Sequence, residues 1–193
     1  MSTMQYENSS EIPITFQQVD MLNSFYKNYL ENNLVKKKEL YDLGILKRVI
    51  FYRENESLQE VFSMYPNFNG GIEIREREYV GDYLKVKEKI FKKGEYIDFA
   101  VTIYDSEGKE IYEAALNLDD ESIILGSVIK YFYKNHGGIL NKKYGFHYDE
   151  DGEIEYMNFD EAYKPYRGNE TADYFGNDWN NMVYYHNDNP MIP

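Results

Sequence analysis

The sequence predicts an α+β fold: an antiparallel sheet of about six to eight strands, arranged as hairpins and a meander, with two or three helices packed on one face. Three observations lead to this prediction. Apolar and polar residues alternate through 72–116, with glycine-containing turns between the alternating segments. Two capping boxes mark helix starts. After residue 159 the apolar residues follow neither the helical spacing of three to four residues nor the strand spacing of two. We therefore expect an irregular acidic and aromatic carboxyl-terminal arm.

The amino-terminal part of the chain predicts a helix and then a hairpin. Thr15 and Gln18 have the spacing of a capping box, and the apolar residues beyond them recur at every third or fourth position. This pattern predicts an amphipathic helix over about 16–32. Strand formers on both sides of a turn at Gly44 then predict a hairpin, with strands over 34–41 and 45–53.

The middle of the chain predicts a short helix and four strands. Ser57 and Glu60 form the second capping box, which predicts a helix of about two turns. From Ile72 to Leu116 the period of two predicts four antiparallel strands in sequence. Lysines and arginines alternate with glutamates along this region, and we expect them to form ion pairs across the strands.

A third helix and a last hairpin are predicted further along the chain. Asp119 or Asp120 can cap a helix whose apolar residues fall on one side and which ends at Gly137-Gly138. A hairpin of 144–148 and 153–159 follows. In domain terms, we expect a single α+β domain over 1–160 and an arm over 161–193 that packs on the domain or on a partner.

Several chemistries are excluded or unsupported by the residues present. The chain has no cysteine, which excludes disulfides and thiolate chemistry. No nucleotide-binding or hydrolase motif occurs, and the three histidines lack metal-site spacing. The run 147–158 overlaps a calcium loop, but His147 and Asn158 stand where that loop needs Asp and Glu, so a hairpin turn is the better interpretation. We therefore expect no cofactor, no metal and no catalytic residues.

Charge is distributed unevenly along the chain. The formal net charge of −13 divides into −3 for 1–33, +3 for 34–93 and −13 for 94–193. Acidic and aromatic residues alternate near the carboxyl end, and an interface for a basic protein requires this combination. The alternative is that the aromatic residues of the arm pack on the core. The expected partner-binding residues are Asp149, Glu150, Asp151, Tyr156, Tyr166, Asp173, Tyr174, Asp178 and Trp179.

These features favour a binding protein over an enzyme. In size, acidity, absence of cysteine and α+β pattern, the chain resembles the small acidic immunity proteins that bacteria keep in the cytoplasm against toxins, many of which are basic nucleases. That resemblance implies a basic protein partner, neutralised by occlusion of its active site. Direct binding to nucleic acid or to a membrane is not expected, because the net charge repels both. The amino terminus has no signal-peptide pattern, which predicts a cytoplasmic location.

Two other functions stay open. A phage-type acidic mimic of nucleic acid would present carboxylates spaced like phosphates and would inhibit a host defence protein. An enzyme with a carboxylate or metal site that forms no sequence motif is the third hypothesis, and converging acids in a pocket would support it.

Overall fold

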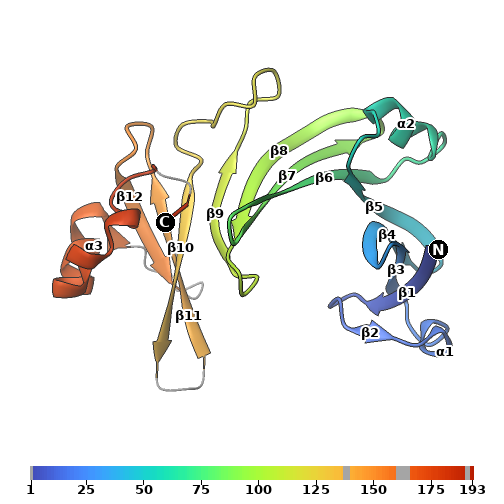
Figure 1. The fold of residues 1–193 in the computed structure, drawn as a ribbon, viewed down its shortest axis with the longest axis horizontal. Coiled ribbons are helices and arrows are strands. Elements are labelled where there is room, and N and C mark those ends of the chain that lie inside the picture. The colour runs from blue at the N-terminus through green and yellow to red at the C-terminus, as the bar shows by residue number, and fades with distance from the viewer. Residues whose placement is uncertain (1, 137–139, 160–165, 190–191) are drawn as a thin grey trace. The chain divides into compact units, whose positions relative to one another are not determined.

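The computed structural model describes residues 2–136, 140–159, 166–189 and 192–193 and is mostly β-sheet with three short α-helices (Figure 1). The prediction of a largely antiparallel sheet with few helices is confirmed in this broad form. The predicted number of six to eight strands was wrong, because the described residues form thirteen. The chain divides into two compact units: the amino-terminal unit comprises Met1–Arg77 and Lys87–Asp98, and the carboxyl-terminal unit comprises Glu78–Val86 and Phe99–Pro193.

The amino-terminal unit begins with antiparallel strands in the order β2-β1-β3-β4-β5. Their bounds are β1 Ser2–Asn8, β2 Pro13–Ile14, β3 Ser24–Glu31, β4 Leu34–Asp42 and β5 Ile45–Arg53. The predicted hairpin of 34–41 and 45–53 is confirmed by β4 and β5. Its turn needs backbone in the left-handed region, and Leu43 and Gly44 have φ values of 50° and 75°. Strand β1 was not predicted, because its residues are mostly polar.

The predicted helix over 16–32 was wrong except for its first turn. The capping box of Thr15 and Gln18 is present, but helix α1 covers only Phe16–Val19. Residues 24–31 form β3, which pairs with β1 on one side and β4 on the other. The aromatic residues of this segment suit a strand better than a helix. Asn32 and Asn33, with φ values of 51° and 65°, provide the hairpin turn that ends it.

Helix α2, Leu58–Ser63, begins where the second capping box predicts. The Glu60 carboxylate accepts the backbone N–H of Ser57 at 2.7 Å, and the Ser57 hydroxyl accepts that of Glu60 at 3.2 Å. The helix connects β5 to β6, Gly71–Val80, and these two strands are parallel. Val61 packs into the core of the unit, whose other buried members are Val49, Phe51, Ile72, Ile74 and Phe91.

The opposite face of this sheet carries the expected ion pairs between strands. Glu73, which is 1% exposed, lies on β6 between Arg48 and Arg75 and pairs with both. Arg75 also reaches Glu88 at 2.8 Å. Basic and acidic groups therefore neutralise one another at this position of the sheet.

Three strands contribute residues to both units: β6, β7 (Tyr83–Lys92) and β8 (Glu95–Tyr104). In the carboxyl-terminal unit the order continues β8-β9-β10-β11-β12-β13, and each described pair after β8 is antiparallel. The remaining bounds are β9 Glu110–Ala115, β10 Ile129–His136, β11 Leu140–Tyr148, β12 Ile154–Phe159 and β13 Tyr166–Arg167. The four strands predicted between 72 and 116 correspond to β6, β7, β8 and β9.

The predicted helix that starts at Asp119 or Asp120 was wrong. Residues 117–127 form a loop, and β10 follows it, paired with β9 and β11. Gly126 has a φ of 77°, which interrupts any helix at that point. The apolar residues of this segment have a spacing that fits a helical face, but a strand rich in Tyr and Phe can have the same spacing. Pairing of β10 with strands on both sides favours the strand over the helix.

The last hairpin is confirmed, with β11 and β12 joined by a turn at Asp149–Gly152. The arm was expected to be irregular, and this was wrong for most of its described residues. It contains helix α3, Gly168–Phe175, and the 3₁₀ helices η1, Gly176–Asn181, and η2, Val183–Tyr185. Glu170 accepts the backbone N–H of Arg167 at 3.0 Å at the start of α3, and Gly176, with a φ of 56°, follows its end.

Candidate functional site

The arm lies against one face of β10, β11 and β12 (Figure 1). Phe146 on β11 has its ring centroid 4.9 Å from that of Tyr185 and 5.9 Å from that of Trp179. Phe175 of α3 is 7% exposed and packs edge-on to Phe132 at 6.0 Å. Aromatic residues of the arm therefore complete the core of the carboxyl-terminal unit.

Lys130 joins the arm to the sheet from inside this core. Its side chain is fully buried, and Nζ donates to the carbonyl oxygens of Tyr184 at 2.7 Å and Asn187 at 2.8 Å. The ammonium group also lies 4.0 Å from the centre of the Tyr184 ring. Burial lowers the pKa of Lys130 to about 8, and the nearby carboxylate of Asp188 opposes this only in part.

The predicted contact residues of the arm have different surroundings. Trp179 is half-buried, with its ring stacked on His186 at 4.5 Å. Asp173 is exposed, and Asp178 is exposed with Oδ2 at 3.3 Å from Nζ of Lys134. Tyr174 is 42% exposed, and its hydroxyl lies 3.4 Å from that of Tyr144. The two aspartates are free to meet a partner, whereas Trp179 packs on the unit itself.

The other predicted contacts lie on the last hairpin and on β13. Asp149 holds the turn, because its Oδ1 accepts the backbone N–H groups of Asp151 and Glu153, both at 3.0 Å. Glu150 and Asp151 are exposed. The ring of Tyr156 on β12 stacks on that of His147 at 4.2 Å. Tyr166 is the first residue of β13, and its side chain lies outside the described part of the structure.

A surface loop that the sequence reasoning missed lies beside this turn. We call residues 117–126 the acidic loop. Three of its apolar side chains are exposed to solvent, Leu118 by 44%, Ile124 by 41% and Leu125 by 63%. The three consecutive acids 119–121 are also exposed. Asp119 or Asp120 had been assigned to a helix cap, and Ile123 and Ile124 to the apolar side of that helix, so the run of acids between Leu118 and Leu125 was not interpreted as a loop.

Hydrogen bonds hold the acidic loop in one conformation. The backbone N–H of Asn117 donates to the carbonyl of Ser122 at 2.8 Å, and its side-chain amide donates to the Ser122 hydroxyl at 2.8 Å. Leu116 and Ile123 form a β-bridge at the base of the loop. Hydrogen bonds from Ser122 also lower the pKa of Asp120, which keeps this carboxylate ionised at neutral pH.

The acidic loop and the hairpin turn form one continuous surface. A Cβ placed on Gly126 would lie 3.5 Å from Cγ of Glu150 and 3.9 Å from the carbonyl carbon of Asp149, so the two segments are in van der Waals range. We call the acidic loop together with residues 149–153 the acidic surface. It contains exposed carboxylates from two separate stretches of sequence together with the exposed Leu118 and Leu125.

The division into units also separates the charge. The amino-terminal unit has 13 basic and 14 acidic residues, for a net charge of −1. The carboxyl-terminal unit has 8 basic and 20 acidic residues, for a net charge of −12. A field of this sign attracts cationic partners and repels nucleic acid.

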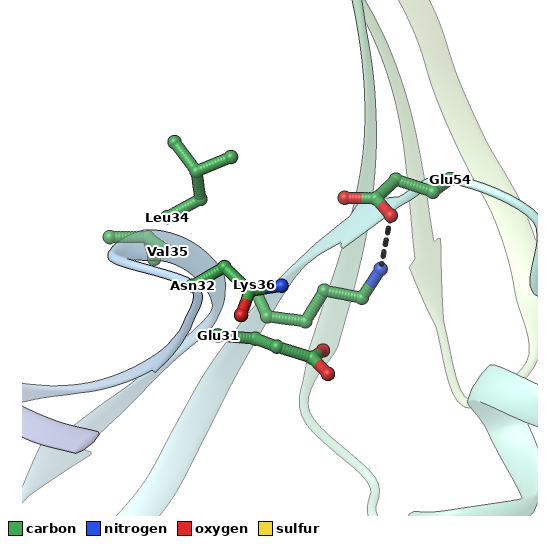
Figure 2. A pocket seen from close by; sticks show the side chains of 6 residues that line it. All are labelled: Glu31, Asn32, Leu34, Val35, Lys36 and Glu54. Atoms are coloured by element: carbon green, nitrogen blue, oxygen red, sulfur yellow. Dashed lines mark ion pairs between the residues drawn. The ribbon is translucent and has the colours of Figure 1, made fainter. Parts of the chain in front are cut away.

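Figure 2 shows a shallow hollow at the β3–β4 turn of the amino-terminal unit, lined by Glu31, Asn32, Leu34, Val35, Lys36 and Glu54. Lys36 pairs with Glu54 at 3.5 Å and with Glu56 at 2.9 Å. The backbone N–H of Glu54 and the Lys36 ammonium lower the pKa of Glu56 to about 2. A carboxylate held ionised in this way is a poor proton donor.

Glu39 is the carboxylate with the most hydrogen-bond donors around it. It is buried on β4 and accepts the hydroxyls of Tyr29 at 2.8 Å, Tyr41 at 3.0 Å and Tyr65 at 2.9 Å. Burial alone raises the pKa of Glu39, but the hydrogen bonds from Lys37 and the tyrosines outweigh it and lower the pKa overall. With its oxygens satisfied, this carboxylate holds Tyr65 against the sheet.

Among the described residues, no group of three or more His, Asp or Glu side chains is arranged to hold a metal ion. Helices long and apolar enough to cross a membrane are likewise absent from the part of the chain that the structure covers. We compared the chain with protein-family models, with curated proteins and with solved structures, and none of them matched.

Proposed function

We propose that this chain is a non-enzymatic binding protein that neutralises a basic protein by covering its active site. The acidic surface of the carboxyl-terminal unit is the contact region in this proposal. The partner is a cationic toxin, such as a nuclease effector, and the chain acts as its cytoplasmic immunity protein in a bacterium. Neither a cofactor nor turnover is required.

One observation carries the proposal: exposed carboxylates and exposed leucines occur together on a unit with a net charge of −12. Surface charge increases the rate of encounter with an oppositely charged protein, while apolar side chains supply the contact area that limits dissociation. A nuclease active site is itself cationic, because it binds phosphates, so an acidic surface is complementary to it.

The experiment is a titration of a basic nuclease toxin with this chain, the toxin being sought first among the genes beside the one that encodes the chain. Nuclease activity should fall linearly and reach zero near one equivalent of the inhibitor, as expected for tight occlusion. A double variant, Asp119→Asn with Asp151→Asn, should weaken inhibition. The matched control, Asp20→Asn with Glu31→Gln, removes two exposed acids from the amino-terminal unit and should leave inhibition unchanged.

Full nuclease activity at a tenfold excess of the chain would refute the proposal. The salt dependence of binding separates it from mimicry of nucleic acid. A mimic that depends on many carboxylates loses about a thousandfold or more in affinity between low and moderate salt, as DNA ligands do. The affinity of a contact that also buries apolar area should fall much less over the same range of salt concentration.

A further inference from the structure

The acidic loop carries a group of exposed apolar side chains among its acids. Single exposed apolar residues are normal, but here three lie within eight positions, at Leu118, Ile124 and Leu125. Leu116 and Ile123, by contrast, take part in the bridge at the base, and Leu116 is 3% exposed. The loop therefore has an anchored, inward side and an apolar outward side.

This outward side is fixed before any partner arrives. Ile124 donates its backbone N–H to the carbonyl of Ala115 at 2.9 Å, and the Ser127 hydroxyl donates to the carbonyl of Ile124 at 2.6 Å. These bonds tie the second half of the loop to β9. A partner that binds such a loop orders little additional backbone, so more of the contact energy is available for affinity.

The charge around these side chains identifies the kind of partner. Acids 119–121 stand between Leu118 and Ile124, and Glu150 lies next to Gly126. A second copy of this chain would bring like charges together, since its own unit carries −12. A protein with an apolar cleft bordered by lysine and arginine is complementary to both the leucines and the acids.

We infer that the acidic loop is the principal anchor of the partner complex, and that Leu118 and Leu125 insert into an apolar cleft with a basic rim on the partner. This inference rests on the proposed function and moves the contact from the arm to the loop. The arm aspartates then act through their charge on encounter more than on affinity.

The test compares three double variants by calorimetry, with the catalytically inactive form of that nuclease toxin as the probe. Leu118→Ser with Leu125→Ser alters the loop, and Asp173→Asn with Asp178→Asn alters the arm. Met21→Ser with Leu34→Ser is the matched control, because both side chains are exposed, by 83% and 61%, on the amino-terminal unit. The loop variant should bind about 30-fold more weakly or worse, and the other two should bind within about threefold of the unaltered chain.

Thermal unfolding of each variant shows whether folding is intact, and we expect no change for the loop variant because its leucines face solvent. Binding that survives in the loop variant and is lost in the arm variant would overturn the inference and leave the proposed function standing. A loop-dependent homodimer on size-exclusion chromatography would overturn it in favour of self-association. If the unaltered chain does not bind the toxin, both proposals fail.

Discussion

The buried ammonium group of Lys130 should make the carboxyl-terminal unit more stable at about pH 9.5 than at pH 7. Its pKa falls from 10.5 in the unfolded chain to about 8 in the folded one. Keeping the charge inside the unit therefore costs about 3 kcal/mol at neutral pH. Neutral lysine retains two N–H groups, enough for the two carbonyl oxygens that it contacts.

The sign follows from proton binding. Between the folded and the unfolded pKa the unfolded chain binds more protons, so the free energy of unfolding increases with pH. By about pH 9.5 roughly 2 kcal/mol of the cost should be recovered. Above about pH 9 the trend should weaken and then reverse, because burial raises the pKa of tyrosines such as Tyr185 and Tyr112 to about 12 while the same groups ionise earlier in the unfolded chain.

Urea unfolding followed by tryptophan fluorescence measures this directly, since Trp179 is the only tryptophan and lies in the arm. In the matched variant, Lys130→Met, the free energy of unfolding should not show this increase with pH, whatever its absolute value is. A flat stability between the two pH values, or an equal increase in Lys130→Met, would refute the argument.

Three further predictions concern other parts of the structure. Trp179→Ala should lower the free energy of unfolding by about 2 kcal/mol, because it leaves a gap in the aromatic core; unchanged urea unfolding by circular dichroism would contradict this. Glu39→Gln should lower stability by about 2 kcal/mol at neutral pH. Because the pKa of Glu39 is lowered on folding, its contribution is lost as pH falls through that value, and the variant and the unaltered chain should converge in acid. Gly152→Ala should lower the free energy of unfolding, measured by calorimetry, by about 1–2 kcal/mol. The reason is that Gly152 has a φ of 78° and a Cβ there would lie 2.7 Å from Asp188. The double variant Gly152→Ala with Asp188→Ala should recover part of this loss.

Local signals predicted the hairpin turns and the two helix starts that have a capping box, whereas the helix start at Asp119 or Asp120 was wrong. Gly44 and Gly152 adopt the left-handed backbone that their hairpins require, and both capping boxes form. These features depend only on residues a few positions apart, so a short stretch of sequence contains all the information needed to predict them. The Asn32-Asn33 pair was an equally good hairpin signal, and it would have ended the predicted first helix.

Features that depend on distant partners were not predictable in this way. Tyrosine and phenylalanine favour strands, but their spacing in both segments also fits a helical face, and pairing with neighbouring strands decided both mistaken helices. The arm shows no period because its contacts are made with the sheet, as when Lys130 binds carbonyls 54 and 57 residues away. Glu150 and Asp151, which were predicted to bind a partner, are exposed, but the proximity of Glu150 to the acidic loop could not be found from spacing along the chain.

The order in which the chain is synthesised gives the arm a further consequence. Phe132, Phe146 and Lys130 leave the ribosome well before the residues that cover them, because Trp179 and Tyr184 follow some tens of residues later. At about 5–20 residues per second, the aromatic face of β10 and β11 is uncovered for a few seconds in every molecule made. During that interval the nascent chain exposes an aromatic surface that can associate with other unfolded chains. Slow translation or early termination in this region should therefore increase binding of the product by chaperones and its degradation by proteases.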